Sequence, residues 1–163
     1  MDYLTNSIIL IIGCGFLSCL LGTWSNKTQA QSSPTLYKQV FVRWEDDGEY
    51  LHSIHWGRKQ EHSPYLTTNK KLKVLSDTKV ILEHWGGTYS GLTRNENCDM
   101  IMEYDGTAWM GQFDTSMEDD GETITGHAEL ALYGHKLFMR DRFLDSQGRI
   151  RWGADEIYKY IRV

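Results

Sequence analysis

The chain has 163 residues, which is enough for one domain with a sizeable hydrophobic core. Its formal net charge of −5 and its scattered Lys and Arg residues exclude a general electrostatic attraction to nucleic acid. Its three cysteines include no Cys-x-x-Cys pair, so we expect reduced thiols and neither a disulfide framework nor a zinc site.

An uncharged apolar run occupies residues 7–24. Its length is marginal for a secretory signal or a membrane anchor, and a TQA sequence ending at Ala30 resembles a signal-peptidase site. Against export, no Lys or Arg precedes the run, and glycines and cysteines interrupt it. Two interpretations stay open at this point. Residues 3–22 form a helix packed on the folded domain, or the segment is a signal or anchor.

Beyond Pro34 the pattern becomes that of short strands separated by tight turns. β-Branched and aromatic residues recur with a period of two, and the breaks carry turn sequences such as EDDG, YDG and DSQG. The expected strands cover residues 36–44, 49–56, 72–76, 78–85, 98–104, 107–113, 127–133, 136–143 and 156–163. No long helical period follows residue 34. The pattern predicts an all-β meander that closes as a barrel or folds as a sandwich.

Several expected strands carry rings and charges on the same face. Because strand side chains alternate between two faces, Asp141 shares a face with Phe143. By the same alternation Glu156 lies beside Tyr158 and Arg162. A dry core does not favour unpaired charges. Burying an uncharged polar group without a hydrogen bond already costs about 2–7 kcal/mol, and burying an unpaired charge costs more. The faces suit a pocket for a flat, partly ionic ligand, or else an exposed sheet surface with Tyr–Arg contacts.

The sequence offers no catalytic or metal motif. His52 and His55 are three residues apart and point to opposite faces of a strand, so we expect no metal site. The glycine-rich stretches match neither a P-loop nor a dinucleotide fingerprint, and no serine occupies a nucleophile elbow. Hydrolase and nucleotide chemistry therefore has no basis in this sequence.

Residues 20–42, LLGTWSNKTQAQSSPTLYKQVFV, resemble the start of a known family. In the CpcT/CpeT family of T-type phycobiliprotein chromophore lyases, an apolar helix leads into a Gly-x-[Phe/Trp]-Ser-Asn-x-x-Gln-Ala segment, then a Pro and a Tyr. The positions that match are Gly22, Trp24, Ser25, Asn26, Gln29, Ala30, Pro34 and Tyr37. On this resemblance the apolar run is the N-terminal helix and TQA is not a cleavage site.

The resemblance continues over nearly the whole chain. Four further stretches follow in the family's order: GEYLHSIHW, SPYL, NCDMIMEYDGTAWMGQF and MRDRFLDSQGRIRWGADE. The chain departs from the family where an Arg-rich strand is replaced by LTTNKK and where the Gly of an Asp-Arg-Gly element is Phe143. Its middle is also shorter than usual, which is compatible with a short phage-type member. The departures fall near expected ligand contacts, so the resemblance supports bilin binding more firmly than transfer.

The resemblance implies a single domain over residues 1–163, a calyx-like (lipocalin-like) antiparallel β-barrel with residues 1–30 as helix and lead-in. It implies a lyase that binds a bilin such as phycoerythrobilin non-covalently and delivers it to a cysteine of a phycobiliprotein subunit. The bilin is then the substrate, and no separate cofactor is expected. A cytoplasmic homodimer without nucleic-acid or membrane partners is expected too. The alternatives are a bilin carrier without transferase activity and an exported lipocalin-like binder of an apolar ligand.

A bilin requires rings to stack on, cations for its two propionates and a carboxylate near its pyrrole nitrogens. Asp141 is the expected carboxylate, with Glu156 as the alternate. Arg142 and Arg162 are expected to pair with the propionates. A regular strand would turn Asp141 into the pocket and Arg142 away from it. The expected stacking and contact residues are Tyr65, Trp109, Trp152 and Tyr158.

Overall fold

The computed structural model describes residues 15–88 and 91–163. Residues 15–20 are helical, which confirms the end of the helix predicted over 3–22, whereas positions 3–14 lie outside the described residues. The helical side chains of Phe16 and Leu20 are fully buried. In the described part of the chain, no helix is both long enough and apolar enough to span a membrane.

Twelve strands make up the rest of the described fold, all paired antiparallel. They are β1 (Gly22–Ser25), β2 (Val40–Asp46), β3 (Leu51–Gly57), β4 (Leu66–Ser76), β5 (Lys79–Thr88), β6 (Gly91–Arg94), β7 (Met100–Tyr104), β8 (Trp109–Asp119), β9 (Glu122–Tyr133), β10 (Lys136–Leu144), β11 (Ile150–Gly153) and β12 (Tyr158–Arg162). Two short helices, α2 (Lys27–Ser32) and the 3₁₀ helix η1 (Glu96–Cys98), interrupt the series.

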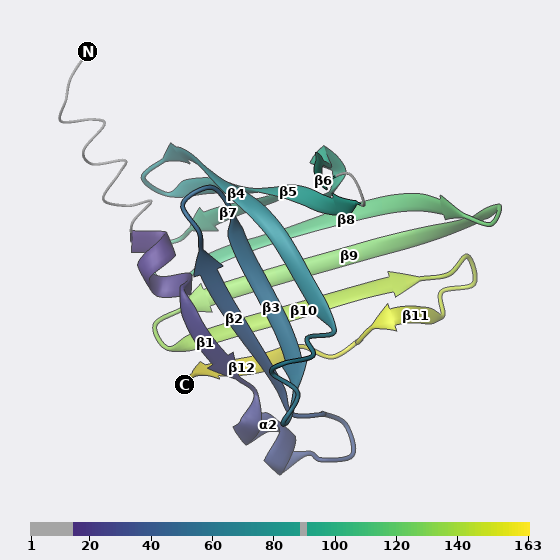
Figure 1. Ribbon diagram of the computed structural model, residues 1–163, viewed down its shortest axis with the longest axis horizontal. Helices are drawn as coiled ribbons and strands as arrows, with labels where there is room; N and C mark the ends of the chain where they lie inside the picture. The colour runs from purple at the N-terminus through teal and green to yellow at the C-terminus, as the bar shows by residue number, and fades with distance from the viewer. Residues whose placement is uncertain (1–14, 89–90) are drawn as a thin grey trace.

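Ten of these strands close into a barrel (Figure 1). The ring runs β10-β12-β1-β2-β3-β4-β5-β7-β8-β9, and β9 pairs again with β10. β6 and β11 lie outside the ring as extra partners of β5 and β10. The prediction of an all-β calyx-like barrel is thereby confirmed, and the sandwich is excluded.

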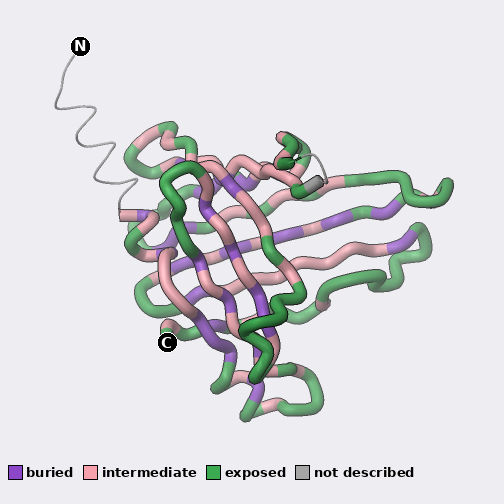
Figure 2. Tube along the Cα trace, in the orientation of Figure 1, coloured by how far each residue is buried: buried purple, intermediate pink, exposed green. Residues whose placement is uncertain are grey.

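The β8–β9 and β10–β11 hairpins extend well beyond the crossing strands β2, β3 and β4 (Figure 1). The outermost residues of these hairpins are mostly exposed, and buried residues alternate along β9 almost to its tip (Figure 2).

The segment after the N-terminal helix belongs to the barrel itself. Asn26 is fully buried, and its side chain donates to the Lys38 carbonyl at 2.9 Å and accepts from the Val40 amide at 2.7 Å. Trp24, also fully buried, donates its indole N–H to a helix carbonyl, that of Leu20, at 2.9 Å. The TQA sequence lies in α2, between two barrel strands. Residues 22–32 thus form a folded motif, as the resemblance implied.

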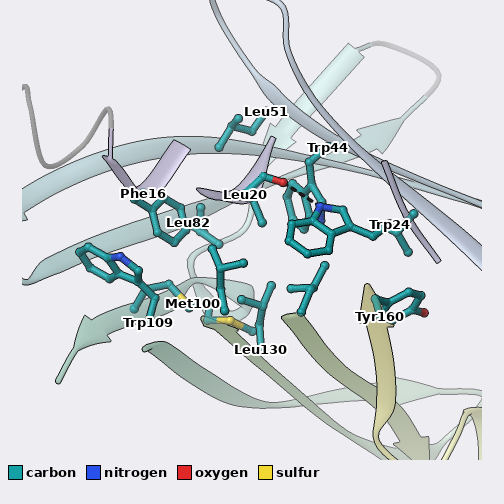
Figure 3. Packing of buried hydrophobic residues seen from close by; sticks show 14 of the residues in the cluster. Phe16, Leu20, Trp24, Trp44, Leu51, Leu82, Met100, Trp109, Leu130 and Tyr160 are labelled. Atoms are coloured by element: carbon teal, nitrogen blue, oxygen red, sulfur yellow. Dashed lines mark hydrogen bonds between the residues drawn. The ribbon is translucent and has the colours of Figure 1, made fainter. Parts of the chain in front are cut away.

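Large apolar side chains close one end of the barrel beside the helical residues (Figure 3). Phe16 packs edge-to-face on Trp109, with ring centroids 5.2 Å apart. Leu20 and Trp24 lie next to Trp44 in the same cluster. Burying such rings stabilises a fold by about 1.5–3 kcal/mol each, so this cluster anchors the barrel at its packed end.

Candidate ligand-binding cavity

Some inward-facing side chains of a long strand belong to the packed core, and others further along the same strand line a cavity. On β3, Leu51 belongs to the core and His55 lines the cavity. On β10, Leu137 belongs to the core, and Asp141 lines the cavity. The period of two that predicted the strands therefore supplies both the closed end of the barrel and the lining of its hollow end.

The hollow consists of two adjoining spaces. The main cavity has a volume of about 310 Å³ and the side cavity about 240 Å³. The lining that they share comprises His55, Leu66, Met139, Asp141 and Trp152. Their combined size is in the range of pockets that hold small organic ligands, about 300–1,000 Å³.

Several aromatic side chains contribute to the walls. The rings that line the two cavities are Trp44, Tyr65, Phe113, Phe143, Trp152, Tyr158 and Tyr160. Tyr65 is 57% exposed as a residue, but partial burial of its hydroxyl raises its pKa to about 12, with smaller contributions from Tyr158 and Asp141. A wall of rings with a few polar groups favours a flat, conjugated ligand.

Two acids line the main cavity. Glu129 is paired with Arg140 and His127. The other is Asp141. It lies in the regular part of β10, opposite Ala128 of β9, and Arg142 opposite His127 faces the other way. Among the described residues, none donates a hydrogen bond or forms an ion pair with the Asp141 carboxyl group. Burial raises its pKa from 3.8 to about 6, against smaller opposing effects of Lys70 and His127. The carboxyl group can therefore hold or release a proton close to neutral pH.

Lys70 brings a positive charge to the same cavity. Its side chain, only 9% exposed, places Nζ 2.9 Å from Nδ1 of His84 and 5.9 Å from the centroid of the Phe113 ring. Burial lowers the pKa of Lys70. Burial and the neighbouring ammonium lower the pKa of His84 to about 4, so at neutral pH the imidazole accepts a hydrogen bond from Lys70.

A neutral polar cluster also lines the main cavity. His55 is buried, and its Nε2 lies 3.0 Å from the hydroxyl of Ser53, which in turn lies 2.6 Å from the Thr68 hydroxyl. Burial lowers the pKa of His55 to about 4, so the ring is uncharged at neutral pH. The cluster adds hydrogen-bonding groups to the wall without adding charge.

An ion-pair clamp fixes the cavity wall at β5, β6 and η1. Arg94 makes two hydrogen bonds to Asp99, at 2.5 and 2.6 Å, and a third interaction with Glu83 at 3.0 Å. Asp99 also accepts from the backbone amide of His84 at 2.9 Å. The clamp holds His84 in place and sets Cys98 on the wall of the main cavity.

The structure brings half of the expected site residues to the cavities. They are Asp141, Tyr65, Trp152 and Tyr158. β10 pairs with β9 without a register shift at these positions, so Asp141 points inward and Arg142 outward, which is the arrangement expected of a regular strand.

The other four expected residues lie elsewhere. Arg142 pairs with Asp155 outside the barrel, and Glu156 is exposed in the turn before β12. Trp109 is buried at the packed end of the barrel. Arg162 donates to the carbonyls at the end of the N-terminal helix and covers the Trp24 ring at 4.5 Å. None of these four side chains lines the two cavities, and three of them, Arg142, Trp109 and Arg162, make contacts within the fold instead.

Lys70 and His84 are the most consequential residues that sequence reasoning missed. Leu66, Thr68, Lys70 and Leu72 alternate inward along β4, but the polar sequence LTTNKK conceals this period of two. Extending the strand that was expected at 72–76 towards its N-terminus would have placed Lys70 inside the barrel.

A closed ten-stranded barrel with an aromatic cavity and a helix at its packed end defines a calyx-like binding fold. Solved structures that share this fold include two that cover nearly all of this chain. The T-type phycobiliprotein lyase CpeT from Prochlorococcus phage P-HM1 aligns with a TM-score of 0.66 over 93% of this chain and 97% of that one, at 18% identity. The CRL protein of Arabidopsis aligns with a TM-score of 0.71 over the same shares of both chains, at 12% identity.

These structural matches agree with the resemblance of the sequence to T-type lyases at the level of the fold. No family model and no curated protein matches the sequence. The role of the cavity must therefore be argued from its own residues.

Proposed function

We propose that this protein is a T-type bilin lyase, which holds a linear tetrapyrrole in the barrel cavity and delivers it to a cysteine of a phycobiliprotein subunit. The observation that carries the proposal is Asp141, a carboxyl group without a partner among the described residues, in an aromatic cavity of the barrel. The shared fold of a T-type lyase supports the same conclusion.

The Asp141 carboxyl group has the properties needed to bind the pyrrole nitrogens of a bilin. A protonated tetrapyrrole presents several N–H donors around one positive charge, and a carboxylate in a low-dielectric cavity attracts them strongly. Because the pKa of Asp141 lies at about 6, its proton can move to the pigment when the pigment binds. The rings of Trp152, Tyr65 and Tyr158 offer flat surfaces for the conjugated system.

The transfer step places few demands on the protein. The thiolate of the acceptor cysteine adds to the ethylidene double bond of ring A, a C–S bond forms, and the tetrapyrrole takes up one proton. No group leaves, and no covalent intermediate with this chain is required. The role of the cavity is to hold the pigment in one geometry and keep it protonated.

A transfer assay tests this proposal. Purified protein is incubated with phycoerythrobilin and an apo-phycobiliprotein subunit, and the denatured subunit is examined for covalent pigment. A lyase gives a single thioether adduct faster than the spontaneous reaction, and Asp141→Asn gives less of it. Binding of the pigment without acceleration at any acceptor subunit would instead identify a carrier and refute the lyase assignment.

A further inference from the structure

We infer that Lys70 is the residue that binds a carboxylate of the ligand. The cavity then accepts a molecule with an anionic group next to Lys70 and a hydrogen-bond-donating or cationic centre next to Asp141. The identification of that carboxylate as a bilin propionate rests on the proposed function. The juxtaposition of Lys70 and Asp141 in one aromatic cavity is what points to it.

The ammonium of Lys70 is buried without a compensating negative charge. In residues 15–88 and 91–163, no carboxylate lies within ion-pair distance of Nζ, whose hydrogen-bond partner is the neutral ring of His84. Burying an ion without a counter-ion costs several kcal/mol, because the desolvation penalty of the charge is not offset. A ligand carboxylate would remove that cost, which is the physical reason to expect one here.

Lys70 also retains the capacity to bind such a group. The ammonium has three donors, and the bond to His84 uses one of them. The His84 backbone is held in turn by Asp99, which the clamp from Arg94 orients. His84 is therefore a positioning residue, which aims Lys70 at the main cavity.

The other cations near the cavity already have partners. Arg140 lines the side cavity, but its guanidinium bonds to Glu129 at 3.1 Å and to the Asp155 carbonyl at 3.0 Å. Lys70 is the one Lys or Arg among the described residues that lines the main cavity. His127 also lines the main cavity and has a raised pKa, but its two ring nitrogens are paired with Glu129 and Asp114. A ligand anion inside the barrel thus has the Lys70 ammonium as its charged partner.

Asp141 and Lys70 impose opposite charges on one enclosed space. Each influences the pKa of the other, although they do not form an ion pair. A protonated tetrapyrrole with a propionate carries the complementary charges, positive towards Asp141 and negative towards Lys70. A purely apolar ligand would leave both groups uncompensated.

Binding of biliverdin and of biliverdin dimethyl ester to the Lys70→Met variant tests the inference. Lys73→Met is the matched control, because Lys73 lies on the same strand and is exposed. We expect Lys70→Met to weaken biliverdin binding about 10- to 100-fold, the range of a charge-assisted hydrogen bond, and to change ester binding less than about twofold. Lys73→Met should change neither. Equal loss for acid and ester, or loss for neither, overturns the inference.

A second ligand pair separates this inference from the proposed function. If neither biliverdin form binds the wild-type protein, the proposed function fails, and cis-parinaric acid and its methyl ester are titrated by fluorescence. Selective loss of the acid in Lys70→Met then supports Lys70 as a carboxylate-binding residue. Equal effects, or no binding of either ligand, overturn it. Lys70→Gln repeats the test if the Met variant does not fold.

Discussion

Replacing Asp141 by asparagine should make the ligand-free protein more stable at neutral pH. The substitution keeps the shape of the side chain and removes a charge that has no hydrogen-bond or ion-pair partner in the described structure. Buried acids that serve a ligand cost stability in the empty protein, because their ionised form loses hydration without gaining a partner.

The magnitude follows from the pKa. Burial raises the pKa of Asp141 from 3.8 to about 6. At about 1.4 kcal/mol per pKa unit, holding the ionised group in the folded state costs about 3 kcal/mol above pH 6. Below pH 3.8 the acid is protonated in both the folded and the unfolded chain, and the cost vanishes. Between these limits the unfolded chain ionises first, so the wild-type protein loses stability relative to Asp141→Asn as the pH rises.

Urea unfolding of both proteins at several pH values between 4 and 7.5 measures this effect. The difference in the free energy of unfolding should be small near pH 4 and should grow to about 3 kcal/mol in favour of Asp141→Asn by pH 7.5. Titrating groups that do not interact with Asp141 cancel in the difference. A variant that is less stable than wild type at pH 7.5, or a difference that does not change with pH, would show that Asp141 is a structural group and refute the reasoning.

Four further outcomes are expected. Asn26→Ala removes two buried hydrogen bonds and should lower the free energy of unfolding by about 2–4 kcal/mol in urea, whereas an effect below 1 kcal/mol, roughly one bond, would contradict this role. Arg162→Met should release the N-terminal helix, seen as faster proteolysis there with the barrel intact; unchanged proteolysis would count against it. Gly153 has φ +88, and Gly153→Ala would drive a methyl group into the Asp141 backbone and should weaken bilin binding. Gly148→Ala, at φ +78 in open space, is the control and should leave binding unchanged. Equal effects of the two substitutions would argue against a link between Gly153 and the position of Asp141. If exposed apolar side chains hold two copies of the chain together as a dimer, light scattering should give twice the chain mass of 18.9 kDa. A measured mass of 18.9 kDa would exclude the dimer.

Local periodicity was sufficient to predict most of the barrel. Every expected strand overlaps an observed one, because alternation and turn residues are properties of short stretches of sequence. The inward face of β10, with Met139, Asp141 and Phe143, follows from the same alternation. The local sequence thus identified the residues that share a face with Asp141, and the resemblance to T-type lyases was needed to assign that face to the cavity.

The remainder depended on contacts between distant residues. β1 and β11 have four residues each, too few for an alternating pattern to be recognised, and β1 is hidden in the apolar run. Arg162 caps the helix across 141 positions of sequence, and nothing near it indicates that partner. Lys70 lies inside the barrel because the register of β4 on β5 turns it there, although its neighbours are polar. Each of these positions is set by closure of the barrel.

Titration of the purified protein with phycoerythrobilin, followed by visible absorbance, tests the central claim most directly. If the cavity holds the pigment against Asp141, the absorbance band should shift to longer wavelength and sharpen, and the change should saturate at one pigment per chain. A spectrum that stays identical to that of free phycoerythrobilin at micromolar protein would contradict the account.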